Sequence, residues 1–197
     1  MSGKRVRIAA WVLGVAAVVA TGAWAKRFND RNEAKLALME AAATAEHMDP
    51  DAAASAYRQA LKIDPKYLPA RTGLADLYSS HSREKALAEH RRGIAADPRN
   101  PEAYYALARA FCEYRRYPEA IKALERAVAL APRATHLHLL LAHTYRWNGD
   151  LDKAREQFMI IQKLDPGSRA AATGLRALER QARSAPAPRS HARGAGR

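Results

Sequence analysis

Four prolines divide the central part of the sequence at a nearly constant interval. Pro65, Pro98, Pro132 and Pro166 are separated by 33, 34 and 34 residues, and each closes a stretch of similar composition, such as PEAIKALERAVALAP at 118–132. Self-similarity at a fixed period of this length indicates a structural unit that recurs along the chain. The architecture of one unit therefore constrains most of the fold.

The stretch over residues 101–134 shows what one unit contains. Pro101 suits the first turn of a helix, where its missing N–H costs nothing. The apolar residues that follow have the helical spacing i, i+3, i+4, i+7: Tyr104, Leu107, Ala108 and Phe111. This stripe breaks near residues 115–117, and a second stripe runs from Pro118 to Pro132. Each unit is therefore predicted to be two amphipathic helices joined by a tight turn, and stacked neighbours are needed to bury their apolar faces.

Aligning the units shows which residue types recur. The chain is rich in alanine, the best helix former, and no segment alternates apolar and polar residues over a strand length, so the fold class is all-α. The recurring positions are alanine (Ala53, Ala86, Ala120, Ala154), leucine followed by alanine (Leu74, Leu107, Leu141), an aromatic residue (Tyr78, Phe111, Tyr145) and a second large residue (Tyr57, His90, Leu124, Phe158). This pattern resembles the tetratricopeptide repeat.

The resemblance implies a solenoid of about four helix-turn-helix repeats over residues 33–166, whose second helices end at the four prolines. The second repeat lacks one residue near His81, so its turn is expected to be tighter. The first helix of the first repeat is degenerate, with Leu38 and Ala42 as its expected key positions. Residues 167–183 read as a capping helix, with several arginines and Glu179 turned mostly to water.

The N-terminus carries a long uncharged segment. Residues 8–25 would form a helix about 27 Å long, close to the ~30 Å core of a bilayer. Three basic residues lie in the segment 1–7 before it, which predicts a cytoplasmic N-terminus. We expect a single-pass anchor in a bacterial inner membrane, a linker at 26–32 and a periplasmic repeat domain. A cleaved signal peptide is the alternative: Ala23-Trp24-Ala25 fits a cleavage site, whereas Lys26-Arg27 directly after the cut disfavours it.

The net charge of +13 is concentrated at the two ends of the chain. Residues 184–197 are rich in arginine and lack apolar residues to bury, which predicts disorder. Binding of nucleic acid or anionic lipid through this tail is an alternative function. It is disfavoured because the tail has no aromatic residues for stacking. Cys112 is the only cysteine, so neither an intramolecular disulfide nor a cysteine-based metal site is expected.

No constellation of residues predicts catalysis. The sequence contains no nucleophile–base arrangement, no phosphate-binding glycine loop and no paired carboxylates in a plausible pocket, so a non-enzymatic protein without cofactor is expected. His136 and His143 share a helix face, but about 10.5 Å of axial rise separates them, too far for one metal ion without other ligands. The histidines are interpreted as polar residues of the repeat surface.

The resemblance implies that the first helix of each repeat lines a peptide-binding groove. The corresponding residues are Thr72, Asp76 and Ser79 in the second repeat; Tyr105, Arg109 and Cys112 in the third; and His136, Leu139, His143 and Arg146 in the fourth, with Trp147 at the rim. Tyr105 and Arg109 stand where chaperone-binding members carry a lysine and an asparagine. A clamp for chaperone tails is therefore not expected.

Two interpretations of these groove residues remain. Arg109 and Arg146 could bind a carboxylate of a partner, with Tyr105 and Trp147 as apolar anchors. Alternatively, the arginines pair with glutamates of the chain such as Glu113, and Trp147 packs on a turn.

The function that follows is a membrane-anchored scaffold or assembly factor that binds a partner polypeptide. Ala10 and Gly14, four residues apart in the apolar segment, favour self-association. A soluble exported form after signal-peptide cleavage is the alternative.

Overall fold

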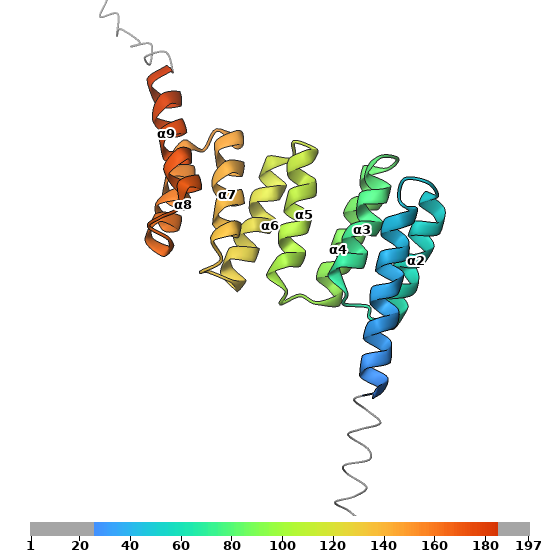
Figure 1. Ribbon diagram of the computed structural model, residues 1–197. Coiled ribbons are helices and arrows are strands. Elements are labelled where there is room, and N and C mark those ends of the chain that lie inside the picture. Colours follow the sequence, from blue (N-terminus) through green and yellow to red (C-terminus); the bar gives the residue numbers. More distant parts are fainter. Residues whose placement is uncertain (1–25, 185–197) are drawn as a thin grey trace, which may run out of the picture. The chain divides into compact units, whose positions relative to one another are not determined.

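The computed structural model describes residues 26–184 (Figure 1). All regular structure in this range is helical. A helix covers residues 26–45, followed by α2 (Pro50–Ile63), α3 (Leu68–Ser79), α4 (Arg83–Ala96), α5 (Pro101–Glu113), α6 (Tyr117–Leu130), α7 (Thr135–Asn148), α8 (Leu151–Leu164) and α9 (Arg169–Ser184). The chain divides into two compact units, one up to Asp97 and one from Pro98 onward.

Three of the expected segments lie largely or wholly outside the described residues, and a fourth, the expected linker, is helical. The basic segment 1–7 and the apolar segment 8–25 fall outside, as does the tail from residue 185. Residues 26–32 are helical, although a linker was expected there. Their side chains lie mostly in water, and the Asn29 amide donates to the Glu33 carboxylate one helical turn later, which supports the helix locally. Among the helices in residues 26–184, none has the length and apolar character needed to cross a membrane.

In the first unit, the helix over residues 26–45, α2 and α3 pack around a core that consists mainly of small residues, and α4 packs against α3. Its buried members are Ala42, Ala54, Ala56, Tyr57, Ala60, Ala70 and Leu74. Ala42 is fully buried and Leu38 packs against this core, as expected for the key positions of a degenerate first helix. Alanine at the contacts lets the helix axes approach closely, and Tyr57 supplies much of the buried apolar surface.

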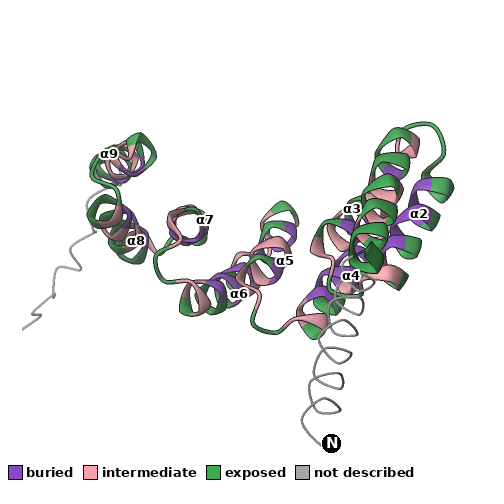
Figure 2. Ribbon diagram, turned by 60° about the horizontal axis from the view of Figure 1, so that its bottom comes forward, coloured by how far each residue is buried: buried purple, intermediate pink, exposed green. Residues whose placement is uncertain are grey.

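The second unit contains the pairs α5/α6 and α7/α8 and the closing helix α9. Helix α9 packs against both α7 and α8. The largest fully buried side chains of this unit are Leu124, Leu137, Phe158, Ile161 and Leu178, which the elements from α6 to α9 contribute. Figure 2 shows the buried positions on the faces that helices turn toward their neighbours within each unit. Burial against a neighbour thus follows the apolar stripes of the sequence.

Each second helix ends two residues before the proline that was expected to close it. Helices α2, α4, α6 and α8 end at Ile63, Ala96, Leu130 and Leu164. The residue before a proline is disfavoured in the helical region of backbone space, so the helix must stop earlier. The residues in that position (Asp64, Asp97, Ala131, Asp165) have φ near −140° and ψ between 74° and 96°.

The first helices of the third and fourth repeats end in the same kind of turn with different residues. After α7, Gly149 has φ +94°, and the Asp150 amide donates to the Tyr145 carbonyl. After α5, Arg115 takes the equivalent place with φ +57°, and the Arg116 amide donates to the Phe111 carbonyl. Both are C-terminal capping turns that require a left-handed residue. A side chain in that conformation is strained, so α5 closes at a higher conformational cost than α7.

Two aromatic side chains pack directly onto glycines of the next helix. A Cβ atom at Gly73 would lie 2.3 Å from the Tyr57 ring, and one at Gly174 would lie 2.3 Å from the Phe158 ring. Both rings are buried, and in both pairs the aromatic residue precedes the glycine by the same number of residues. Glycine is therefore required at these positions because the ring of the preceding helix occupies the space of a side chain.

We predict that Gly73→Ala and Gly174→Ala each destabilise the fold by about 1–3 kcal/mol, because the added methyl group overpacks an aromatic ring in the core. Gly93→Ala is the matched control. Its Cβ would lie 3.4 Å from Leu68 Cδ1 and Arg71 Cδ, which is ordinary van der Waals contact, so the helix preference for alanine should leave stability equal or raise it by up to about 1 kcal/mol. Chemical unfolding followed by far-UV circular dichroism measures all three. Equal effects at the three glycines would contradict the packing argument.

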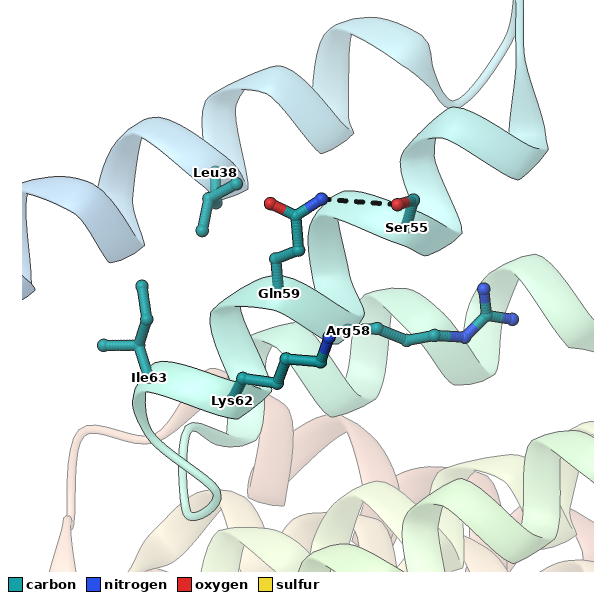
Figure 3. Close-up of a pocket in the computed structure, with 6 residues that line it drawn as sticks. All are labelled: Leu38, Ser55, Arg58, Gln59, Lys62 and Ile63. Carbon is teal, nitrogen blue, oxygen red and sulfur yellow. Dashed lines mark hydrogen bonds between the residues drawn. The ribbon is translucent and has the colours of Figure 1, made fainter.

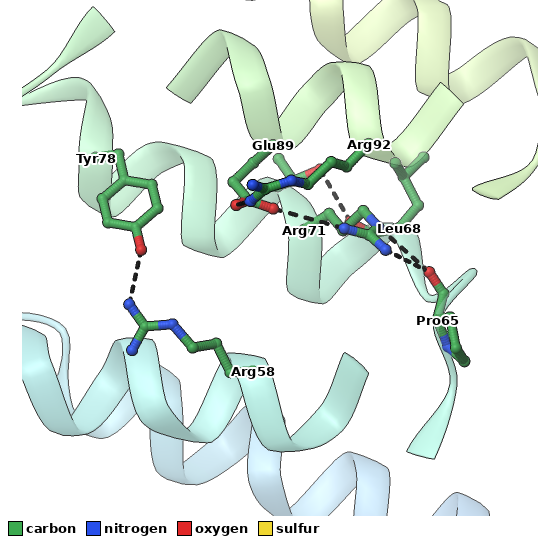
Figure 4. Close-up of polar contacts among 8 residues, drawn as sticks. Arg58, Pro65, Leu68, Arg71, Tyr78, Glu89 and Arg92 are labelled. Atoms are coloured by element: carbon green, nitrogen blue, oxygen red, sulfur yellow. Dashed lines mark hydrogen bonds and ion pairs between the residues drawn. The ribbon is translucent and has the colours of Figure 1, made fainter. Parts of the chain in front are cut away.

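A buried carboxylate links the helices of the second repeat. Glu89 on α4 is 4% exposed and pairs with Arg71 on α3 at 3.5 Å and with Arg92 one turn later on its own helix (Figure 4). Arg71 also donates to the Pro65 carbonyl from two nitrogens, at 2.9 and 3.2 Å. Because the buried charge is paired and hydrogen-bonded, it is compatible with the interior and fixes how α3 lies on α4.

Candidate functional site

The predicted groove residues of the third repeat lie on one side of α5. Tyr105 and Cys112 are half-buried and Arg109 is exposed. The Cys112 sulfur lies 3.3 Å from the Thr144 hydroxyl on α7, and burial raises the pKa of this thiol. A protonated thiol is a poor nucleophile, so Cys112 serves packing between α5 and α7.

Helices α5 and α7 also meet through polar and aromatic contacts. His136 Nε2 lies 2.9 Å from the Glu102 carboxylate, and the His136 ring meets the Tyr105 ring edge-on with centroids 5.4 Å apart. These contacts bring the predicted residues of the third and fourth repeats onto one continuous surface. We call it the α5–α7 surface: Tyr105, Arg109, Cys112, His136, Leu139, His143, Arg146 and Trp147.

The two arginines of this surface differ in their surroundings. Arg109 lies 3.9 Å from Glu113 one turn later, and both side chains are more than half exposed. An exposed pair of this kind contributes little to stability, so Arg109 remains free to exchange Glu113 for another carboxylate. Arg146 is half-buried, and its Nε is buried without a hydrogen-bond partner among the described residues. Pairing with a nearby glutamate, one of the two interpretations, therefore applies to Arg109 and not to Arg146.

Trp147 and His143 form an aromatic group near the end of α7. The two rings stack with centroids 5.9 Å apart, and the indole ring also lies 5.9 Å from the Tyr117 ring of α6. Trp147 is nevertheless 47% exposed, so it both packs on the turn that leads into α6 and presents an apolar face to solvent. From the other side, the Phe158 ring of α8 meets His143 edge-on at 5.3 Å.

A pocket of about 460 Å³ lies between α7 and α9. His143 and Arg146 line it from α7, and Arg169, Ala170, Thr173, Gly174 and Ala177 line it from α9. His143 is half-buried there, and burial together with the positive charge of Arg146 lowers its pKa below the usual 6.5. The imidazole is therefore neutral at pH 7. The Nδ1 atom of His143 is buried without a hydrogen-bond partner within residues 26–184.

Two histidines differ from the expectation that they lie on the repeat surface. His138 is 3% exposed, with Nδ1 2.8 Å from Gln157 Oε1 and Nε2 3.0 Å from the Pro132 carbonyl oxygen. His90 is 4% exposed on α4. Periodicity alone did not separate these positions from exposed ones, because histidine is compatible with either. In the part of the chain that the structure describes, no three His, Cys, Asp or Glu side chains gather where a metal ion could be held.

The predicted groove residues of the second repeat lie in the first unit and form local contacts. The Thr72 hydroxyl donates to the Leu68 carbonyl at 3.1 Å, and the Ser79 hydroxyl donates to the carbonyl of Asp76 at 2.7 Å. The first unit also has a pocket of about 520 Å³ over α2, lined by Leu38, Ser55, Arg58, Gln59, Lys62 and Ile63 (Figure 3). Its polar lining consists of side chains in contact with water, with no buried group left for a ligand to satisfy.

The family relationship follows from comparison with known proteins. Residues 113–178 match a family model described as Tetratricopeptide repeat, and residues 91–122 match a second model with the same description. Residues 91–178 therefore carry tetratricopeptide repeats. No curated protein sequence matches the chain significantly.

Several solved structures share the fold. The crystal structure of MamA is 27% identical, with a TM-score of 0.57 over 67% of this chain and 78% of MamA. The Pseudomonas aeruginosa pilF protein is 24% identical, with a TM-score of 0.63 over 78% of this chain and 71% of that chain. The second tetratricopeptide domain of human RPAP3, solved with the HSP70 peptide SGPTIEEVD, is 24% identical, with a TM-score of 0.50 over 55% and 92% of the two chains.

Sequence reasoning missed two parts of the site. Glu102, the partner of His136, lies one full repeat length before it, so the repeat period contains the signal for this contact. The contribution of Arg169 and the small residues of α9 to the pocket could not be found in the same way. The closing helix lacks a second helix as partner, and its position on α7 depends on tertiary packing.

We predict that acidification destabilises the second unit partly through His143. The pKa of His143 in the folded state lies below its unfolded value of 6.5, so the unfolded chain takes up the proton first as the pH falls. Stability is then present above pH 6.5 and is lost as the pH falls below it, until the folded state is protonated as well. His143→Gln should flatten this part of the profile of melting temperature against pH. His47→Gln, at an exposed position, is the control and should leave the profile unchanged.

Proposed function

We propose that this protein is an interaction scaffold that binds a partner polypeptide on the α5–α7 surface of its second unit. The observation that carries the proposal is the combination of an exposed arginine and accessible aromatic faces on adjoining first helices of two repeats. Arg109 is more than half exposed, Trp147 is 47% exposed, and Tyr105 is held by its ring contact with His136. Aromatic side chains and arginines are the residues that dominate binding energy at protein interfaces.

The peptide complex of the related fold supports this class of ligand. The RPAP3 domain binds an HSP70 peptide that contains two consecutive glutamates. In our chain Tyr105 and Arg109 replace the lysine and asparagine that the resemblance associates with chaperone tails. We therefore propose a different peptide, whose acidic group pairs with an arginine and whose apolar side chain packs on Trp147 or Tyr105.

Capture from an extract of the source cells tests this surface. We expect the full-length protein to retain a partner polypeptide. The double variant Tyr105→Ala/Arg109→Ala should bind this partner at least about tenfold more weakly, because an aromatic anchor and a charge are lost together. Lys122→Ala/Arg126→Ala on α6 removes two exposed cations and is the control. A partner held equally by wild type and the Tyr105/Arg109 variant would show that the α5–α7 surface is not the binding site.

The proposed location is the outer face of a bacterial inner membrane. The support is the uncharged segment 8–25 together with the preceding Lys4, Arg5 and Arg7, which favour a cytoplasmic N-terminus. An anchor would raise the effective concentration of a weak peptide binder near membrane partners. A soluble exported form after cleavage near Ala25 is the alternative.

A reporter fusion tests the location. Alkaline phosphatase, which is active only after export, should be active when fused to the C-terminus and should sediment with membranes at the full-length mass. Replacement of Lys4, Arg5 and Arg7 by glutamate should lower the activity, because the positive charges that hold the N-terminus inside are lost. An inactive wild-type fusion would contradict export, and an active, soluble, shortened product would establish cleavage.

A further inference from the structure

The pocket between α7 and α9 combines positive charge with an uncharged lining. Arg146 and Arg169 supply two positive charges, His143 supplies an imidazole, and four small residues of α9 complete the wall. No acidic side chain is among the described residues that line it. Its volume of about 460 Å³ falls within the ~300–1,000 Å³ typical of ligand sites.

The positive charge of this pocket is not neutralised by the described part of the chain. Arg71 and Arg116 each have a glutamate partner, whereas no carboxylate of residues 26–184 pairs with Arg146. Within residues 26–184, Arg146 Nε and His143 Nδ1 are buried without hydrogen-bond partners. Burying a polar group without a partner is costly, and a half-buried unpaired arginine more so, which points to a ligand that supplies negative charge.

We propose that this pocket binds the C-terminal carboxylate of a partner polypeptide together with the apolar side chain of its last residue. The inference rests on the proposed peptide-binding function and names the chemistry that the ligand presents. The guanidinium of Arg146 would hold the carboxylate in the fork geometry that arginine favours, and Arg169 would add a second positive charge. Arg169 and Ala170 also belong to the first turn of α9, where the helix dipole favours an anion.

The lining distinguishes a chain terminus from a simple anion. Ala170, Thr173, Gly174 and Ala177 have small side chains, so the wall of α9 leaves room beside the two cations. A phosphate or sulfate ion has no apolar part to fill that room. A chain terminus carries a carboxylate and a side chain on the same carbon atom. The carboxylate would face the two cations, and the side chain would lie against the uncharged wall of α9.

The pocket is continuous with the α5–α7 surface through His143. This residue lines the pocket, and its ring stacks on the exposed Trp147. A polypeptide whose last residue lies in the pocket would therefore extend from it onto the α5–α7 surface.

His143 reports occupancy of the pocket. The charged groups around it are Arg146 on its own helix and Arg169 across the pocket on α9, while α8 presents the uncharged Phe158 ring. Burial and the Arg146 charge lower the pKa of the imidazole. A carboxylate placed beside these cations offsets their charge, so binding should raise the pKa of His143.

Full-length protein with ¹³C-labelled histidine, in detergent micelles, provides the test by NMR. The probes are the tripeptide acetyl-alanyl-alanyl-leucine with a free carboxylate, its C-terminal amide, acetyl-alanyl-glutamyl-leucinamide and inorganic phosphate. We expect the free acid to shift the His143 resonance saturably and to raise its pKa, and the amide to do neither. Arg146→Gln should weaken binding of the free acid by about 30-fold or more. Arg146→Lys should weaken it less, because lysine keeps the positive charge and loses only the forked guanidinium geometry.

Arg155→Gln on α8 is the matched control, since it removes one cation that pairs with Asp152 away from the pocket. It should leave binding unchanged. Equal binding of acid and amide, or no effect of Arg146→Gln, would overturn the proposal. Phosphate that binds as tightly as the free acid would show a general anion site, and preference for the glutamyl amide would show a site for acidic side chains; both overturn it.

The proposed function and this inference can fail separately. A captured partner that depends on Tyr105 and Arg109 but binds Arg146→Gln as well as wild type would retain the α5–α7 surface and reject the terminal pocket. Binding of the free tripeptide without any partner that depends on Tyr105 and Arg109 would retain the pocket and reject the wider surface.

Discussion

The structure depends on the inability of a two-helix unit to bury its own apolar face. An amphipathic helix pair leaves one side exposed to water, and only a neighbouring pair or a closing helix can cover it. Small residues let the neighbouring helices pack closely. Alanine occupies many of the buried contact positions, and glycine occupies the two places where an aromatic ring packs on the next helix. Helix α9 completes this arrangement in the second unit, because it covers α7 and α8 without adding a helix pair of its own.

The candidate site is a consequence of the same arrangement. Stacking brings the first helices of the third and fourth repeats together, so that Tyr105 meets His136 and Cys112 meets Thr144. The closing helix then converts the end of α7 from an open face into one wall of a pocket. Arg146 therefore has a half-buried environment, whereas Arg109 in the preceding repeat is exposed. Two arginines on the first helices of successive repeats thus acquire different chemistry from what packs beside them.

The second unit also contains the features that a peptide ligand would recognise. Rings at Tyr105, His136, His143 and Trp147 lie along adjoining helices, and the cations Arg146 and Arg169 line the pocket beside His143. By contrast, the buried ion pair of Glu89 with Arg71 in the first unit is satisfied internally and holds α3 on α4. Charge has a structural use in the first unit, whereas part of it remains available for binding in the second.

The repeat period was sufficient to predict the helical class, the order of the helices and most of their buried positions. It succeeded because the spacing of apolar residues is a local property that each helix carries in its own sequence. The helix ends at Ile63, Ala96, Leu130 and Leu164 were placed two residues too late, since the proline restricts the residue before it as well. The burial of His90 and His138 and the unpaired state of Arg146 required the tertiary structure. Whether a polar side chain is buried, paired or free depends on which helix packs against it, and that partner lies outside the local sequence pattern.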